Sequence, residues 1–213
     1  MTDVPDPERS PPSPRPSSAR ETGGVASRAE PAAQGEDAPL QDRLFSASHP
    51  WTDAHRAARL LAADPHGLGG AVVRAPARPE RERWLETLRA ALPSGTPWRR
   101  LPPGIGDDSL LGGLDLAATL AAGRPIARAG LLAEADGGIV LVPMAERLPP
   151  GTASRLAATL DTGTVSDRRA RFGLILLDEG VADETVAEAL ADRLAFRIDL
   201  SGLGLGEAAA AEP

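Results

Sequence analysis

The sequence predicts an α/β domain built on a mainly parallel sheet with flanking helices. Two apolar runs, residues 139–142 and 172–177, are typical of strands that are buried on both faces. Segments with helical spacing of apolar residues separate these runs from further strand-like segments. Alternation of this kind is typical of a parallel sheet with right-handed crossover connections. Because 42% of residues are hydrophobic but only 3% are aromatic, the core must consist mainly of Leu, Val, Ala and Ile.

Three regions of different composition divide the chain. Residues 1–39 are rich in proline, serine, alanine and charge, and this composition predicts a disordered tail because little apolar surface is available for burial. Residues 40–200 carry the periodic segments and form the predicted α/β domain. Residues 201–213 are low in complexity and are expected to be a flexible C-terminal tail.

The elements of the predicted domain follow one another in a regular order. Pro79 favours the first turn of a helix, and Gly112 and Gly113 interrupt a helical region that begins at Asp108 or Ser109. The expected helices cover residues 52–63, 80–91, 114–122, 130–136, 150–161 and 183–194. The expected strands cover residues 71–74, 98–101, 139–142, 172–177 and 195–200, and residues 124–128 are expected to form a hairpin or an excursion.

The composition argues against several classes of function. The net charge of -7 disfavours a nucleic-acid partner, because binding to phosphates needs a basic surface. The chain has no cysteine, so disulfides and thiolate metal sites are excluded, and its three histidines lack the spacing of a metal cluster. No apolar run reaches the roughly 18 residues that span a bilayer, and no apolar segment typical of a signal peptide follows the N-terminus. We therefore expect a cytoplasmic protein without a metal site.

The turn after the strand at 71–74 lies where a phosphate-binding loop would be expected. All 23 basic residues are arginine, so the pattern GxxxxGKS/T cannot occur in this chain. In the frame of that pattern, Ala75 and Glu80 replace the two glycines, Arg81 replaces the lysine, and Glu82 takes the last position. Prolines in the turn lack N–H donors, and the two glutamates would repel phosphate oxygens. A plain strand–turn–helix connection is therefore favoured over nucleotide binding, although Arg81 could still neutralise an anion.

The strand at 139–142 ends without the acidic residues that hold Mg²⁺ and polarise the attacking water in P-loop ATPases. Pro143 and Met144 stand there instead, and neither side chain can perform these tasks. The order of short helix, glycine turn and buried strand is similar to that of an ATPase. The sequence therefore predicts ATPase-like architecture without the chemistry for binding a metal.

Six spaced segments of the chain form one ordered pattern: DDSLLGGLDL at 107–116, AGRP at 122–125, GLLAEADGG at 130–138, LAATLDTG at 156–163, ARFG at 170–173 and LADRL at 190–194. Together these segments resemble the AAA+ module of magnesium chelatase. The resemblance covers about residues 47–200. It is specific because several spaced segments occur in the family's order. It implies a P-loop NTPase-like AAA+ core.

The pattern of losses points to one component of that family. Magnesium chelatase inserts Mg²⁺ into protoporphyrin IX at the start of chlorophyll and bacteriochlorophyll synthesis. Its I subunit carries intact ATPase motifs, whereas the N-terminal AAA+ module of its D subunit is often degenerate. With its altered turn at 75–82 and the Pro143–Met144 strand end, this chain resembles the D subunit.

The resemblance also implies roles for two further positions. The strand at 172–177 corresponds to the family's sensor 1 strand, near whose end active members carry an Asn and this chain carries Glu179. Arg193 matches the arginine of a family segment that resembles an arginine finger presented to a neighbouring subunit. An equally supported interpretation is that Arg193 only interacts favourably with the dipole at a helix C-terminus.

Three functional hypotheses follow. The first is a non-catalytic platform that assembles in a ring with the ATPase I subunit, and indirectly with the large porphyrin-binding subunit. The I subunit would then bind the ATP and Mg²⁺, and this chain would bind no cofactor. The alternative is a divergent nucleotide hydrolase whose metal ligand is Glu146 or Glu179. The third is a relic without a role in assembly.

The resemblance also raises an expectation about the rest of the D subunit. That protein normally continues through a helical lid, an acidic proline-rich linker and an integrin-like domain with a DxSxS metal site, none of which occurs in this sequence. A fragment, a split gene product and a decayed paralogue are all open interpretations. The stretch from 163 to 172 is also short for the hairpin that the family places before sensor 1.

Overall fold

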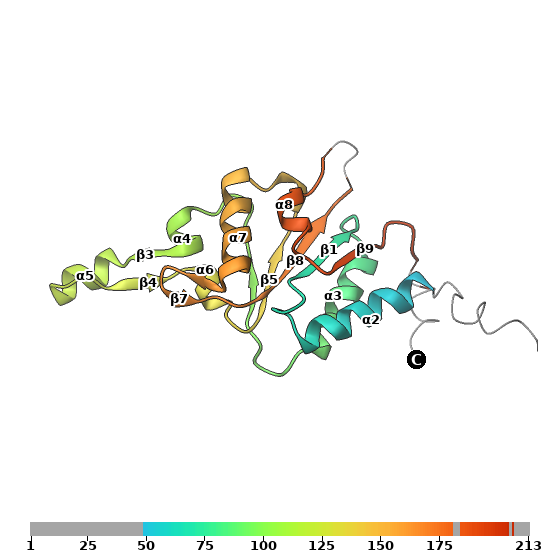
Figure 1. Cartoon of the computed structure of the whole chain (residues 1–213), viewed down its shortest axis with the longest axis horizontal. Helices are drawn as coiled ribbons and strands as arrows, with labels where there is room; N and C mark the ends of the chain where they lie inside the picture. Colours follow the sequence, from blue (N-terminus) through green and yellow to red (C-terminus); the bar gives the residue numbers. More distant parts are fainter. Residues whose placement is uncertain (1–48, 181–183, 205, 207–213) are drawn as a thin grey trace, which may run out of the picture. The chain divides into compact units, whose positions relative to one another are not determined.

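The computed structural model describes residues 49–180, 184–204 and 206 (Figure 1). The predicted disordered tail at 1–39 and most of the predicted C-terminal tail lie outside these described residues. The described part forms an α/β domain around a five-stranded sheet in which every pair of neighbouring strands is parallel. The predicted fold class is confirmed.

The sheet has a completely buried strand, β8 (Gly173–Asp178), at its centre. In spatial order the strands are β2 (Trp98–Arg100), β5 (Ile139–Val142), β8 (Gly173–Asp178), β1 (Gly70–Arg74) and β9 (Phe196–Asp199). All residues of β5 and β8 are buried, as expected for strands with helices on both faces. Because neighbouring strands in this order are not consecutive in sequence, helical crossovers connect them.

Helices cover both faces of the sheet, so that two apolar clusters form. Along β5 and β8, Val140 and Leu174 pack into one cluster, whereas Ile139 and Ile175 pack into the other. This alternation follows from the two-residue period of a strand. One cluster includes residues of α4 (Asp107–Leu111), α6 (Leu131–Glu134), α7 (Pro150–Thr162) and α8 (Glu188–Ala191), and the other includes residues of α2 (Pro50–Ala63) and α3 (Pro79–Ala91).

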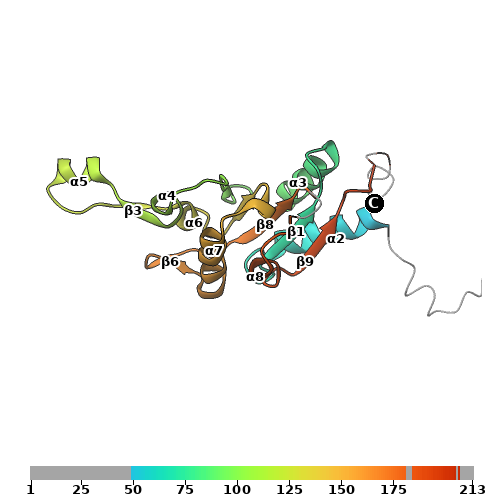
Figure 2. The same ribbon diagram turned by 90° about the horizontal axis from the view of Figure 1, so that it is seen from above.

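An insertion extends away from the sheet and is formed by β3 (Gly112–Leu114), α5 (Leu116–Ala122) and β4 (Ala127–Ala129) (Figures 1 and 2). The two glycines that were expected only to interrupt a helix instead form β3, which pairs antiparallel with β4. Gly112 has φ 93°, and a Cβ atom there would lie 2.6 Å from the carbonyl oxygen of Arg128. Only glycine allows this close approach of the two strands.

The prediction of a helix at 183–194 is wrong for most of these residues. Residues 184–187 are not helical, and α8 covers only Glu188–Ala191; residue 183 lies outside the described residues. Val186 and Ala187 pack against the core cluster, and Ala187 has ψ 118°. Tertiary packing therefore overrides the helical propensity of this alanine-rich segment.

A short hairpin lies between α7 and β8, in the stretch that looked short for the hairpin of the family. It consists of β6 (Thr164–Val165) and β7 (Arg168–Arg169). Ser166 and Asp167, at φ 45° and 62°, form its turn. Two positive φ values in succession are typical of the tight turns that join antiparallel strands. Within the described ranges, no helix combines the length and apolar character that a membrane span requires.

Candidate functional site

The strands β1, β5 and β8 are neighbours in the sheet and end at the same edge. Ligands of open parallel sheets bind at this carboxyl edge. In the register of β1 and β8, Arg74 lies opposite Asp178, so the turn after β1 and the residues after β8 are adjacent. The structure therefore brings three of the sequence-predicted positions to one edge: the turn at 75–82, the strand end at 143–144, and Glu179.

The turn after β1 is closely attached to β8 and offers few donors to an anion. Ala75 is buried, and its N–H donates to the carbonyl oxygen of Asp178 at 2.8 Å. Pro76 has no N–H group, and neither has Pro79, the first residue of α3. Glu80 follows, with a buried Oε2 atom that has no hydrogen-bond partner in the described part of the chain. The row of N–H groups that cradles phosphate in a P-loop is therefore interrupted at positions 75, 76 and 79 of this turn.

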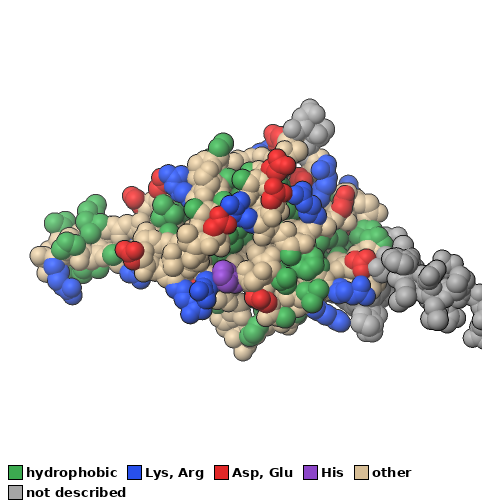
Figure 3. All heavy atoms as spheres, in the orientation of Figure 1, with side chains coloured by type: hydrophobic (Ala, Val, Ile, Leu, Met, Phe, Trp, Pro, Cys, Tyr) green, Lys and Arg blue, Asp and Glu red, His purple; other side chains and the backbone are tan. Residues whose placement is uncertain are grey.

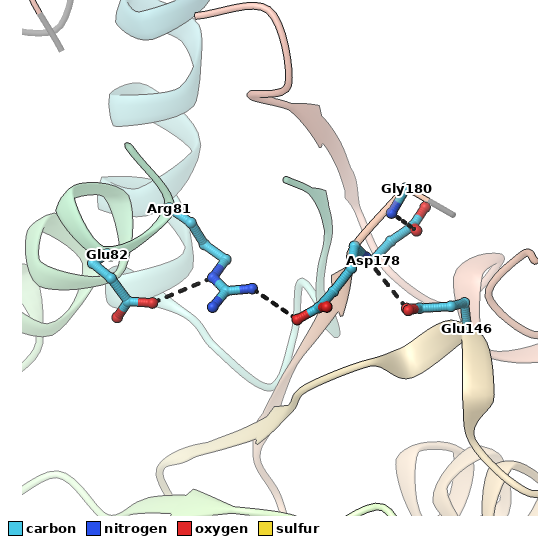
Figure 4. Close-up of polar contacts among 6 residues, drawn as sticks. Arg81, Glu82, Glu146, Asp178 and Gly180 are labelled. Atoms are coloured by element: carbon cyan, nitrogen blue, oxygen red, sulfur yellow. Dashed lines mark hydrogen bonds and ion pairs between the residues drawn. The ribbon is translucent and has the colours of Figure 1, made fainter. Parts of the chain in front are cut away.

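Arg81, at the position of the P-loop lysine, is held by two carboxylates (Figure 4). Its Nη1 lies 3.2 Å from Oε1 of Glu179, and its Nε lies 3.3 Å from Oε1 of Glu82. The side chain of Arg81 is only 12% exposed, compared with 32% for Glu179 and 61% for Glu82. The guanidinium of Arg81 therefore contacts Glu179, the residue for which the resemblance predicts the sensor 1 position.

The end of β5 turns away from the sheet. Pro143 is buried, and Met144 adopts a left-handed conformation with φ 49°. The turn leads directly into a single turn of 3₁₀ helix, η1 (Ala145–Arg147). Neither residue offers a ligand for a metal, as expected from their side chains.

Glu146 in η1 reaches back towards the sheet edge. Its Oε2 accepts a hydrogen bond from the N–H of Glu179 at 3.3 Å, and its Oε1 is buried without a partner in the described residues. Under the hydrolase hypothesis, Glu146 can act as a metal ligand only if its side chain reaches back towards the end of β5, as it does here. Among the described residues, however, no group of three or more His, Cys, Asp or Glu side chains is arranged to hold a metal ion.

Asp178 is a further acidic residue of this edge. It is the last residue of β8 and is buried, with Oδ2 3.5 Å from Nη1 of Arg74 and Oδ1 accepting from the N–H of Gly180 at 2.8 Å. An acidic residue at the end of an entirely apolar strand was the signal available in the sequence. The edge thus carries five carboxylates, of Glu80, Glu82, Glu146, Asp178 and Glu179, and four guanidinium groups, of Arg74, Arg78, Arg81 and Arg147.

Arg193 lies elsewhere, after the end of α8, and is engaged within its own chain. Its Nε and Nη2 donate to the two carboxylate oxygens of Asp161 at 2.7 and 2.6 Å, and its Nη1 donates to the carbonyl oxygen of Ala189. The hydrogen bond from Arg193 lowers the pKa of Asp161, and the same bond raises the pKa of Arg193. The sequence did not indicate Asp161 as a partner.

Proteins that resemble this chain in sequence are subunits of one enzyme. The magnesium-chelatase 60 kDa subunit of Cereibacter sphaeroides is 47% identical over 159 residues, which are 74% of this chain and 26% of the relative. The 60 kDa subunit of Rhodobacter capsulatus is 41% identical over 143 residues, 67% of this chain and 24% of the relative. The chain thus spans about a quarter of the length of these curated relatives. No protein-family model matches the chain.

Solved structures that resemble the domain are ATPase-like. A chain in a model of the complex between subunits BchI and BchD of magnesium chelatase has a TM-score of 0.55 and 20% identity, covering 77% of this chain and 65% of that chain. A putative ATPase from Cytophaga hutchinsonii has a TM-score of 0.51 and 15% identity, covering 76% and 52%. At these identities the likeness shows the fold alone, which is the P-loop NTPase-like fold of AAA+ type that the sequence predicted.

Proposed function

We propose, from the premise that this chain is a homologue of the magnesium-chelatase 60 kDa (BchD-type) subunit, that it is a non-catalytic AAA+ platform. In this role it assembles with the ATPase I subunit, in a ring, for the ATP-dependent insertion of Mg²⁺ into protoporphyrin IX in (bacterio)chlorophyll biosynthesis. The I subunit supplies the ATP and Mg²⁺ sites, and the large porphyrin-binding subunit is an indirect partner. The proposal places the protein in the cytoplasm.

The observation that carries the proposal is the contact between Arg81 and Glu179 at 3.2 Å. A nucleotide needs the cation at this position to be available for its phosphates. Here the carboxylate of Glu179 is already paired with the guanidinium of Arg81, and further carboxylates lie at the same edge. Like charges at such short range disfavour a triphosphate, so the domain keeps the fold of an ATPase without a site for its substrate.

The proposal includes a role in trans for Arg193. An arginine from one subunit can stabilise the charge that develops on a phosphoryl group bound by the next subunit. In this chain Arg193 is exposed, and its charge is held in a defined orientation by the bidentate contact with Asp161. Such a contact fixes a planar guanidinium better than it would fix a lysine.

The hydrolase alternative rests on Glu146, whose buried Oε1 has no partner among the described residues. A metal ion bound with ATP could supply that partner. Under this alternative, ATP and Mg²⁺ bind to the isolated chain, and binding is lost in Glu146→Gln. Under the platform proposal, neither protein binds them.

Two measurements test the proposal. Titration calorimetry of the full chain with ATP and Mg²⁺ is expected to give no binding heat, whereas the I subunit in the same buffer binds. Co-purification with the I subunit, with and without ATP, is expected to recover a complex. ATP turnover by the isolated chain would overturn the platform role, and failure to associate under both conditions would favour the relic.

The role of Arg193 has its own readout in that complex. Arg193→Ala is expected to leave the complex intact and to lower ATP hydrolysis by the I subunit, because the guanidinium no longer stabilises the charge on the phosphoryl group in trans. If ATP hydrolysis is unchanged in Arg193→Ala, Arg193 has no role in trans and serves only in its contact with Asp161.

A further inference from the structure

Arg81 carries a charge that burial makes costly. A guanidinium stays protonated at any physiological pH, and a charge removed from water must be paired. The side chain of Arg81 is 12% exposed, and its two carboxylate partners come from different elements. Glu82 is a neighbour on α3 and is largely exposed to water, whereas Glu179 belongs to the segment after β8, 98 positions along the chain. Glu179 is therefore the partner that links α3 to the sheet edge.

Glu179 is itself held in place. Its N–H donates to Oε2 of Glu146, and Gly180 follows at φ 75°, where glycine is favoured. The N–H of Gly180 donates in turn to Oδ1 of Asp178. Backbone contacts thus fix the segment that presents the Glu179 carboxylate to Arg81 (Figure 4).

We infer that Glu179 is a built-in anion that occupies the Arg81 site, and that removal of its carboxylate opens the site to a small inorganic oxyanion such as phosphate. A carboxylate and a phosphate present similar acceptor oxygens to a guanidinium. In the native chain the Glu179 carboxylate binds Arg81 in preference to phosphate, because it is part of the same molecule. Its effective concentration is therefore high, and it loses little entropy on binding. This inference does not depend on assembly with an ATPase subunit.

The surrounding residues determine the class of ligand. Pro76 and Pro79 remove N–H donors from the turn, so the extended cradle that binds a nucleotide triphosphate is not available. A single compact anion needs only the guanidinium. Glu80 and Glu82 flank Arg81 in sequence and weaken binding of a highly charged ligand, which favours phosphate over a polyphosphate.

The test uses the full chain and four proteins: the unsubstituted chain, Glu179→Gln, the double variant Arg81→Gln/Glu179→Gln, and Glu86→Gln. The last removes the same charge from an exposed position of α3 and is the matched control. Phosphate binding is measured by calorimetry and by the shift in melting temperature, at constant ionic strength set with chloride. We expect Glu179→Gln to bind phosphate at least about tenfold more tightly than the unsubstituted chain, a difference of about 1.4 kcal/mol. The double variant and Glu86→Gln should show no gain.

Stability gives a second readout that does not need phosphate. Glu179→Gln leaves the buried charge of Arg81 with only the largely exposed Glu82 as a partner, whereas the double variant removes that charge as well. The double variant is therefore expected to melt at a higher temperature than Glu179→Gln. If Glu179→Gln does not fold, the double variant is still expected to fold. Equal phosphate affinity in Glu179→Gln and Glu86→Gln, or a double variant no more stable than Glu179→Gln, would overturn the inference. ATP binding to the unsubstituted chain would instead bear on the proposed function.

Discussion

The partner of each arginine determines what that arginine can do in this chain. Arg81 and Arg193 are both assigned by comparison with ATPase motifs, one to a phosphate site and the other to a role in trans. Arg81 is mostly buried, and two of its guanidinium nitrogens already contact the carboxylates of Glu82 and Glu179. Arg193 is exposed, and one carboxylate, that of Asp161, orients it. The same side-chain chemistry therefore serves a closed contact inside the domain and an oriented charge on its surface.

The Arg193–Asp161 contact makes stability depend on pH. Because Arg193 lowers the pKa of Asp161 in the folded state, the contact stabilises the fold fully above the ordinary aspartate pKa of about 3.9. This contribution is lost as the pH falls through the lowered folded value. Asp161→Asn is therefore expected to unfold at lower urea concentration than the unsubstituted chain at pH 7, with a gap that narrows below about pH 4.

The matched control for this prediction is the same substitution made in Arg193→Ala. Without the guanidinium, Asp161→Asn should change the urea midpoint little at any pH. A gap that is constant from pH 7 to pH 3 in the unsubstituted background would show that the contact with Arg193 does not stabilise the fold.

At the scale of elements, apolar faces and a few buried polar contacts determine how helices and strands assemble. The helices α2 and α3 lie on the same face of the sheet, and Trp51 and Trp84 are completely buried in their shared cluster. The indole N–H of Trp84 donates to the carbonyl oxygen of Ala54 at 2.8 Å and so joins the two helices. With few aromatic residues in the chain, each buried one contributes a large share of the apolar area.

Trp84→Phe is expected to lower the free energy of unfolding by about 1–3 kcal/mol. The substitution removes a buried hydrogen bond, worth about 1 kcal/mol, and leaves a cavity between α2 and α3. Trp98→Phe is the comparison, because Trp98 is only partly buried and its ring is covered by Arg89 at 4.3 Å. The decrease in the free energy of unfolding for Trp98→Phe should be under about 1 kcal/mol. Equal losses in urea denaturation would contradict the role of Trp84 as the link between the helices.

At the scale of the whole domain, the most unusual feature is an apolar tip that packs against nothing described. No residue of α5 is buried, and Leu114, Leu116 and Leu120 are 52%, 68% and 84% exposed. Figure 3 shows hydrophobic side chains gathered at the end of the domain that α5 forms in Figure 1. Exposed apolar patches of this kind mark surfaces for protein association. The tip is thus a candidate contact surface for the assembly proposed above.

Leu116→Ser/Leu120→Ser is expected to leave the melting temperature almost unchanged, because neither side chain contributes to the core. The same double variant is expected to weaken co-purification with the I subunit about tenfold or more, since truncating anchor side chains at an interface commonly costs over 1 kcal/mol each. Leu60→Ser, at an exposed leucine of α2, is the control and should associate normally. Normal association of the double variant would exclude the tip as the contact surface.

The sequence by itself determined the α/β class and the buried strands, because these depend on local periodicity and on residue type, and it predicted the loss of the nucleotide motifs. Lysine is absent from position 81 whatever the fold, and Pro143 and Met144 cannot bind Mg²⁺ in any arrangement. Local pattern failed at 184–187, where packing on the core prevents a helix, and at Gly112, where a second strand approaches closely.

Only the tertiary structure decided which carboxylate meets which arginine. Glu179 reaches Arg81, and Asp161 reaches Arg193, across sequence separations of 98 and 32 positions. Such pairings depend on the order of strands in the sheet and on the register between them, which no local pattern encodes. For this reason the sequence could predict an altered nucleotide site, whereas only the fold showed that the carboxylate of Glu179 contacts Arg81.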